Sequence, residues 1–153
     1  MDNLIAPHGG TLINPLVNGD RADEIRESSR EWPSIDLTQR QLCDLELVLN
    51  GGFSPLDRFM GSAEMASVVS DMRLSDGVFW PLPVTLDIDG PTADGLKTGE
   101  AVALRDSEGV MLAALEVDGE PERVQDLHVV TTLHGGFPQP ARAVALGAAG
   151  EDC

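Results

Sequence analysis

The spacing of apolar residues changes once along this chain, near Val78, and that change limits the folds open to it. Before Val78, apolar residues recur three or four positions apart, which is the period of an amphipathic helix. After Val78 they alternate, so that Val84, Leu86 and Ile88 share one face of an extended segment. Helices followed by strands are typical of the α+β class, which is the fold class we predict.

Three helices are expected in the N-terminal half. The first spans 18–32 and begins near Asp20, with Ala22 and Ile25 on its inner side. Thr38 is the expected cap of the second, which spans 39–49 and ends at two glycines. Ser62 is the expected cap of the third, which closes by 76–77. Its expected core stripe comprises Met65, Val68, Val69 and Met72.

The expected strands are short and separated by polar turns. They span 34–37, 84–89, 101–104, 110–117, 127–133 and 141–146, and a solvated loop is expected over 90–99. Five or six strands of similar length favour a small barrel, which leaves few exposed edges. We therefore divide the chain into a main domain over 1–120, strands that complete the barrel over 121–146, and a flexible tail over 147–153.

The chain is 153 residues long, which is the size of one domain, and its charge excludes some functions. Twenty-six acidic residues against ten basic ones give a net charge of −16, and Lys97 is the single lysine. Nucleic-acid binding is not expected, because it needs clustered cations that displace counterions from phosphates. No apolar run is long enough to cross a bilayer, so we expect a soluble, cytoplasmic protein. Cys43, expected in the core, and Cys153 are expected to be reduced thiols.

Metal and nucleophile chemistry find little support in the residue pattern. His128, His134 and Asp126 could be imagined as ligands, but one strand supplies too few groups for a closed site. Ser54 and His8 do not form a triad pattern, and no nucleophile elbow surrounds any serine. We expect no catalytic residue, no metal and no cofactor within this chain.

Four stretches together resemble the opening domain of ATP sulfurylases (sulfate adenylyltransferases), a PUA-like pseudobarrel. The resemblance covers about 4–117 and rests on several uncommon strings in register. These strings are LIAPHGGTLIN at 4–14, CDLELVLNGGFSPL at 43–56, RFMG at 58–61 and DMRLSDGVFWPLPVTLD at 71–87.

The resemblance implies a family reaction in which sulfate attacks the α-phosphate of ATP and releases pyrophosphate. In that family the following domain holds the phosphates with a Gln-x-Arg-Asn loop and a His-x-x-His pair, and this chain contains neither motif. Two hypotheses follow. The chain is a non-catalytic module that docks in trans on a nucleotidyltransferase domain, or it is an independent barrel that binds a small ligand or RNA.

Three loops with bulky side chains are the predicted docking face. Their candidate residues are His8, Gly9, Gly10, Phe53, Ser54, Pro55, Phe59, Met60 and Trp80. The glycines of 7–10 could cradle an anion or make a tight turn in which His8 binds backbone. Ser54 is expected to cap a helical turn that has Pro55 at its first position. The alternative for the bulky residues is that they fill the ends of the barrel.

Overall fold

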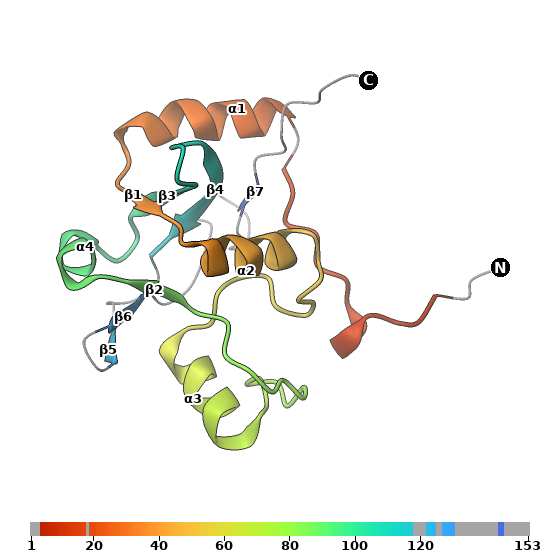
Figure 1. Ribbon diagram of the computed structural model, residues 1–153. Coiled ribbons are helices and arrows are strands. Elements are labelled where there is room, and N and C mark those ends of the chain that lie inside the picture. The colour runs from red at the N-terminus through yellow and green to blue at the C-terminus, as the bar shows by residue number, and fades with distance from the viewer. Residues whose placement is uncertain (1–3, 18, 118–121, 125–126, 131–143, 146–153) are drawn as a thin grey trace.

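The structure, a computed structural model, describes residues 4–17, 19–117, 122–124, 127–130 and 144–145 (Figure 1). Its elements are η1 (His8–Gly10), α1 (Gly19–Ser28), η2 (Ser29–Glu31), β1 (Ser34–Asp36), α2 (Gln39–Leu49), α3 (Ser62–Asp71), β2 (Leu86–Ile88), α4 (Gly90–Gly95), β3 (Ala101–Arg105), β4 (Met111–Glu116), β5 (Glu122–Val124), β6 (Leu127–Val130) and β7 (Val144–Ala145). The α+β class is confirmed, and two small sheets fit the pseudobarrel that the resemblance implies.

The described strands form two sheets. The first has the order β1-β3-β4-β7, in which β1 runs parallel to β3 and the other neighbours are antiparallel. The second has the order β2-β6-β5 and is antiparallel throughout. A hairpin joins β3 to β4, with Ala103 paired to Ala114 and a register shift after Leu104. The division of the chain at residues 120 and 146 remains a prediction.

The first sheet is covered on both faces. Val102 and Leu104 of β3 point into the main core together with Leu115 of β4. The residue between them, Ala103, belongs to a second cluster with Ile25 of α1. Alternate side chains of a strand point to opposite faces, so the main core lies on one face and α1 on the other. Figure 1 shows α1 next to β3 and β4. The helix predicted over 18–32 corresponds to α1 and η2, and Ala22 and Ile25 are buried as expected.

The second helix begins and ends where its sequence signals place it. The hydroxyl of Thr38 accepts a hydrogen bond from the backbone N–H of Gln41, and the Gln41 side chain accepts one from the backbone N–H of Thr38. This reciprocal capping box satisfies two N–H groups that the helix itself leaves free. Gly51 follows the last turn with a φ of 81°, a conformation that glycine adopts without a Cβ penalty.

The third helix departs from prediction in two ways. It begins at Ser62 with Gly61 in the cap position, so Ser62 is not the cap. Only Val68 of the expected core stripe is fully buried, whereas Val69 and Met72 are exposed. Figure 1 shows the reason, because α3 lies at the edge of the molecule and one side of it has no neighbouring element.

Residues 90–95 form a helix where a loop was expected. The Asp89 carboxylate accepts a hydrogen bond from the N–H of Thr92, and Pro91 lies in the first turn, where its missing N–H costs nothing. Ala93 and the following Leu96 are buried against the main core, which explains why this glycine-rich segment is ordered as α4. A second correction concerns Cys43, which is exposed on α2 and is not a core residue.

Candidate interaction surface

The first candidate loop is a tight turn. In η1 the N–H of Gly10 donates to the carbonyl of Pro7 at 2.9 Å, and both Gly9 and Gly10 have positive φ. The Nε2 of His8 lies 2.7 Å from the carbonyl oxygen of Phe79, and since a carbonyl only accepts, Nε2–H is the donor. The turn with His8 bonded to backbone is therefore the conformation present, and His8 ties this N-terminal segment to a loop 71 residues away.

Ser54 holds the same N-terminal segment at a second point. Its buried hydroxyl donates to the carbonyl of Gly51 at 2.6 Å and accepts from the N–H of Ile13 at 2.9 Å. Residues 55–61 are not helical, so the predicted capping role is wrong, and the Ser54 hydroxyl bonds Gly51 and Ile13 instead. A Cβ at Gly51 would lie 2.6 Å from the carbonyl oxygen of Ile13, which shows how closely the two segments approach.

Gly9 and Pro55 make a third point of approach. A Cβ at Gly9 would lie 2.8 Å from Cγ of Pro55, so a side chain larger than hydrogen would push the two apart. The Ser54-Pro55 peptide bond is cis. The structure therefore places four candidate residues along one seam, by which we mean the line of contact between residues 8–13 and the rest of the molecule. They are His8, Gly9, Ser54 and Pro55, and their separation in sequence does not reveal that they lie close together.

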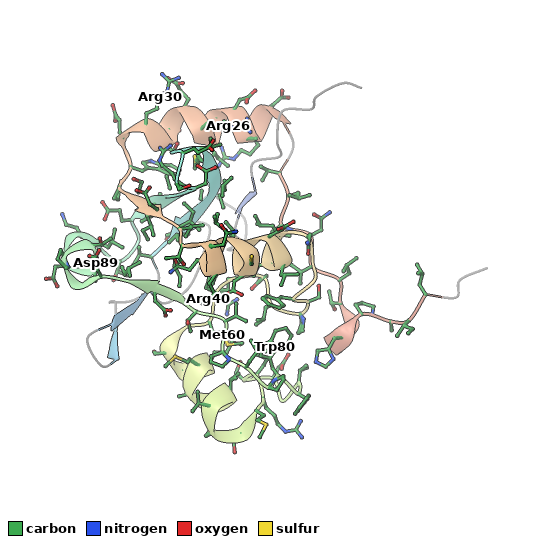
Figure 2. The ribbon with its side chains drawn as sticks, viewed as in Figure 1. Arg26, Arg30, Arg40, Met60, Trp80 and Asp89 are labelled. Carbon is green, nitrogen blue, oxygen red and sulfur yellow. The ribbon has the colours of Figure 1, made fainter. Side chains whose placement is uncertain are left out.

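The bulky members of the predicted docking face lie inside the molecule. Phe59, Met60 and Trp80 are 1%, 0% and 8% exposed, and all three belong to the main core. Figure 2 shows Met60 and Trp80 between α2 and α3. Phe53 is half-buried and meets Trp80 edge to face, with ring centroids 5.7 Å apart. The hypothesis that these residues fill the core holds for Phe59, Met60 and Trp80, because few other aromatic side chains are available to fill it.

Other apolar side chains are exposed, and sequence reasoning did not single them out. Leu4 and Ile5 are 93% and 96% exposed on the segment that projects from the body in Figure 1. Phe79 and Leu82, on either side of the buried Trp80, are about half exposed. All five residues of 78–82 are apolar, so no alternation in the sequence separates the exposed Phe79 from the buried Trp80.

A pocket of about 330 Å³ lies away from this seam. It is lined by Ser34, Ile35, Asp36, Thr38, Gln41, Asp87, Ile88, Asp89 and Thr92. At its wall, Nε2 of Gln41 donates to the carbonyl of Asp87, and Arg40 forms an ion pair with the Asp87 carboxylate. Arg40 and Asp89 are labelled in Figure 2, on α2 and beside α4. A space lined by hydroxyl and carboxylate groups suits a small polar or cationic molecule better than an anion, because carboxylates repel negative charge.

The pKa of one carboxyl group in α3 is shifted from its ordinary value. Burial raises the pKa of Glu64 above its ordinary value of 4.5, the nearby Arg58 opposes this rise, and the carboxylates of Asp57 and Asp76 add to it. Within the described part of the chain, no group of three or more histidine, cysteine or acidic side chains is placed to hold a metal ion. His128 belongs to β6, whereas Asp126, His134 and Cys153 lie outside the described residues.

No helix in the described ranges combines the length and apolarity needed to cross a membrane. The cytoplasmic location expected from the sequence remains a prediction.

Comparisons with known proteins agree with the resemblance seen in the sequence. The profile of a PUA-like domain matches residues 5–130. The sulfate adenylyltransferase of Synechococcus sp. is 42% identical over 115 residues, which cover 75% of this chain and 29% of that protein. The sulfate adenylyltransferase of Candida albicans is 35% identical over 155 residues, which cover 95% of this chain and 29% of that protein.

A solved structure also matches most of this chain and a minor part of its own. A hexameric APS kinase from Thiobacillus denitrificans superposes with a TM-score of 0.77 and 34% identity, over 95% of this chain and 28% of that one. This chain thus spans less than a third of each relative it matches.

Proposed function

Since this chain belongs to the family of PUA-like domains, we propose that it is a non-catalytic module of sulfate activation that docks on a nucleotidyltransferase domain. The proposal rests on how small a share of its relatives this chain covers. Three quarters of this chain align with the Synechococcus enzyme, yet they account for 29% of that protein. A domain that is one part of longer adenylyltransferases has a neighbour in those proteins, and the same neighbour is the simplest partner for it here.

The charge and surface of the described residues support docking over catalysis. Stabilising the phosphates of ATP requires cations or aligned N–H groups, whereas this chain carries a net charge of −16. The tight turn at His8–Gly10 has its histidine already bonded to the backbone of Phe79. The exposed Leu4, Ile5 and Phe79 are the kind of side chain that a protein partner covers.

The test is a binding titration with the part of the Synechococcus sulfate adenylyltransferase that this chain does not cover. We expect a saturable complex between the two purified proteins, and no pyrophosphate release from ATP and sulfate by this chain alone. Restoration of sulfate-dependent pyrophosphate release on mixing would support the module in trans. Absence of any complex, or turnover by this chain alone that a substitution within it abolishes, would contradict the proposal.

A second candidate function is favoured by the pocket beside α2. An independent barrel that binds a small polar or cationic molecule would use the hydroxyl and carboxylate groups of Ser34, Asp36 and Asp89. Loss of ligand binding in Asp36→Asn, measured by calorimetry with a panel of small amines and sugars, would favour this alternative. RNA is a poorer occupant, because the carboxylates of this pocket repel phosphate groups.

A further inference from the structure

The N-terminal segment projects from the body of the molecule with its apolar side chains uncovered. Residues 8–13 are held to the body at three points, through His8 to Phe79, through Gly9 against Pro55, and through Ile13 to Ser54. Beyond these points the chain extends outward in Figure 1, and Leu4 and Ile5 are almost fully exposed. The segment is thus fixed in direction by polar contacts and is apolar at its end.

A second apolar surface lies beside the first anchor. His8 contacts the backbone of Phe79, whose own side chain is half exposed, and Leu82 is exposed to the same degree. Trp80 between them is buried, and its ring centroid lies 6.1 Å from that of the His8 ring. The 79–82 loop and the N-terminal segment are joined at His8. We give the name arm surface to their exposed apolar residues Leu4, Ile5, Phe79 and Leu82.

Charge distribution indicates what covers the arm surface. A quarter of the residues in this chain are charged, yet no Asp, Glu, Lys or Arg occurs between Asp2 and Asp20 or between Asp76 and Asp87. These two uncharged stretches are the ones that His8 joins. A second copy of this chain would bring another net charge of −16 close by, which opposes association at low salt. An apolar surface on a different protein has no such penalty.

We propose that the arm surface is the part of this chain that binds the nucleotidyltransferase domain, with an uncharged, apolar patch of that domain closing over Leu4, Ile5, Phe79 and Leu82. This inference rests on the proposed docking function and names its contact residues. The buried Phe59, Met60 and Trp80 support the surface from within and do not touch the partner.

The test compares three variants of the full chain in titration against the part of the Synechococcus enzyme that this chain does not cover. Ile5→Asp and Phe79→Asp should each raise Kd by about tenfold or more, because each places a charge in an apolar contact. The matched control is Val110→Asp, on the β3–β4 turn, because Val110 is as exposed as Phe79 and the added charge is the same. Its Kd should stay within about twofold of the parent.

The outcomes separate this inference from the function on which it rests. If the parent chain binds and both arm variants bind equally well, the arm surface is wrong and docking stands. If the parent chain does not bind, docking and the arm surface both fail. If sedimentation shows that the parent chain self-associates and Ile5→Asp is monomeric, the occupant is a second copy and the assignment to the nucleotidyltransferase domain is overturned. Melting temperatures unchanged in Ile5→Asp would confirm that a loss of binding is not a loss of folding.

Discussion

Two aromatic residues that are adjacent in sequence have opposite environments in this structure. Trp80 is 8% exposed and Phe79 is 51% exposed, although both lie in the connection between α3 and β2. The backbone N–H of Trp80 donates to the carbonyl of Met72, and the carbonyl of Phe79 accepts from His8. The extended backbone turns one ring toward the core and the next toward solvent. The two adjacent side chains thus differ in burial, one belonging to the core and the other to the surface.

Burial predicts a large difference between two phenylalanine truncations. Phe59→Ala should lower the free energy of unfolding by about 3–5 kcal/mol, because it opens a cavity among fully buried neighbours. Phe79→Ala should change it by less than about 1 kcal/mol, because half of that ring is already in water. Urea denaturation followed by circular dichroism measures both values. Similar losses in the two variants would contradict the burial described for Phe59.

At the scale of elements, α2 and α3 show how a helix is fixed at its ends and along its faces. The capping box of α2 uses Gln41, whose side-chain N–H group also donates to the carbonyl of Asp87 in β2. One buried amide therefore joins the start of a helix to the second sheet. In α3 a carboxyl group, Glu64, occupies the first turn near Arg58 and is partly buried there.

The position of Glu64 predicts a pH-dependent gain from its amide variant. Because burial makes the pKa of Glu64 higher in the folded than in the unfolded chain, stability from this group is fully present below pH 4.5 and is lost as pH rises through the folded-state pKa. Glu64→Gln cannot ionise, so its free energy of unfolding relative to the parent should rise between pH 4 and the folded-state pKa and then level off.

Denaturant titrations of parent and variant at pH 4 and at neutral pH measure this difference. Glu46→Gln on α2 is the matched control, because that carboxylate is exposed. A difference between parent and Glu64→Gln that is independent of pH, or that shrinks toward neutral pH, would show that Glu64 is not destabilised by its surroundings.

At the scale of the whole molecule, charge and architecture both disfavour binding to a phosphate backbone. Two sheets share one apolar core, α1 covers the outer face of the first sheet, and acidic residues dominate the surface. Most of the described arginines form ion pairs with nearby carboxylates. These pairs are Arg21 with Glu24, Arg26 with Asp23, Arg30 with Glu27, Arg40 with Asp44 and Asp87, and Arg58 with Asp57. Cations already beside carboxylates offer little to a phosphate backbone.

The molecule is therefore expected to bind RNA weakly. At physiological salt, fluorescence anisotropy with a labelled single-stranded RNA should show no complex at about 1 μM of this chain, since even non-specific binding needs several free cations. Lysozyme, a basic protein, serves as the positive control for the assay. A complex below that concentration, weakened by added salt, would place a cationic surface on this chain that the described residues do not provide.

The sequence alone determined the elements whose causes are local. The alternation of Val84, Leu86 and Ile88 predicted a strand with one buried face, and all three are buried. Thr38 predicted the start of α2, because a capping hydrogen bond spans only three residues. The family resemblance added the PUA-like fold, since several uncommon strings occur in register over most of the chain.

Only the tertiary structure decided which sides of these elements are covered. Val69 lies on a helix with a regular apolar stripe, yet it is exposed because no element packs against that side of α3. Ser54 follows the pattern of a helix cap, yet its hydroxyl binds Ile13, 41 residues away. Phe59 and Phe79 are chemically identical and both lie in loops, so their opposite burial depends on distant neighbours. A local pattern fixes hydrogen bonds and periodicity, whereas burial depends on which remote segments pack together, and the candidate surface followed from that packing.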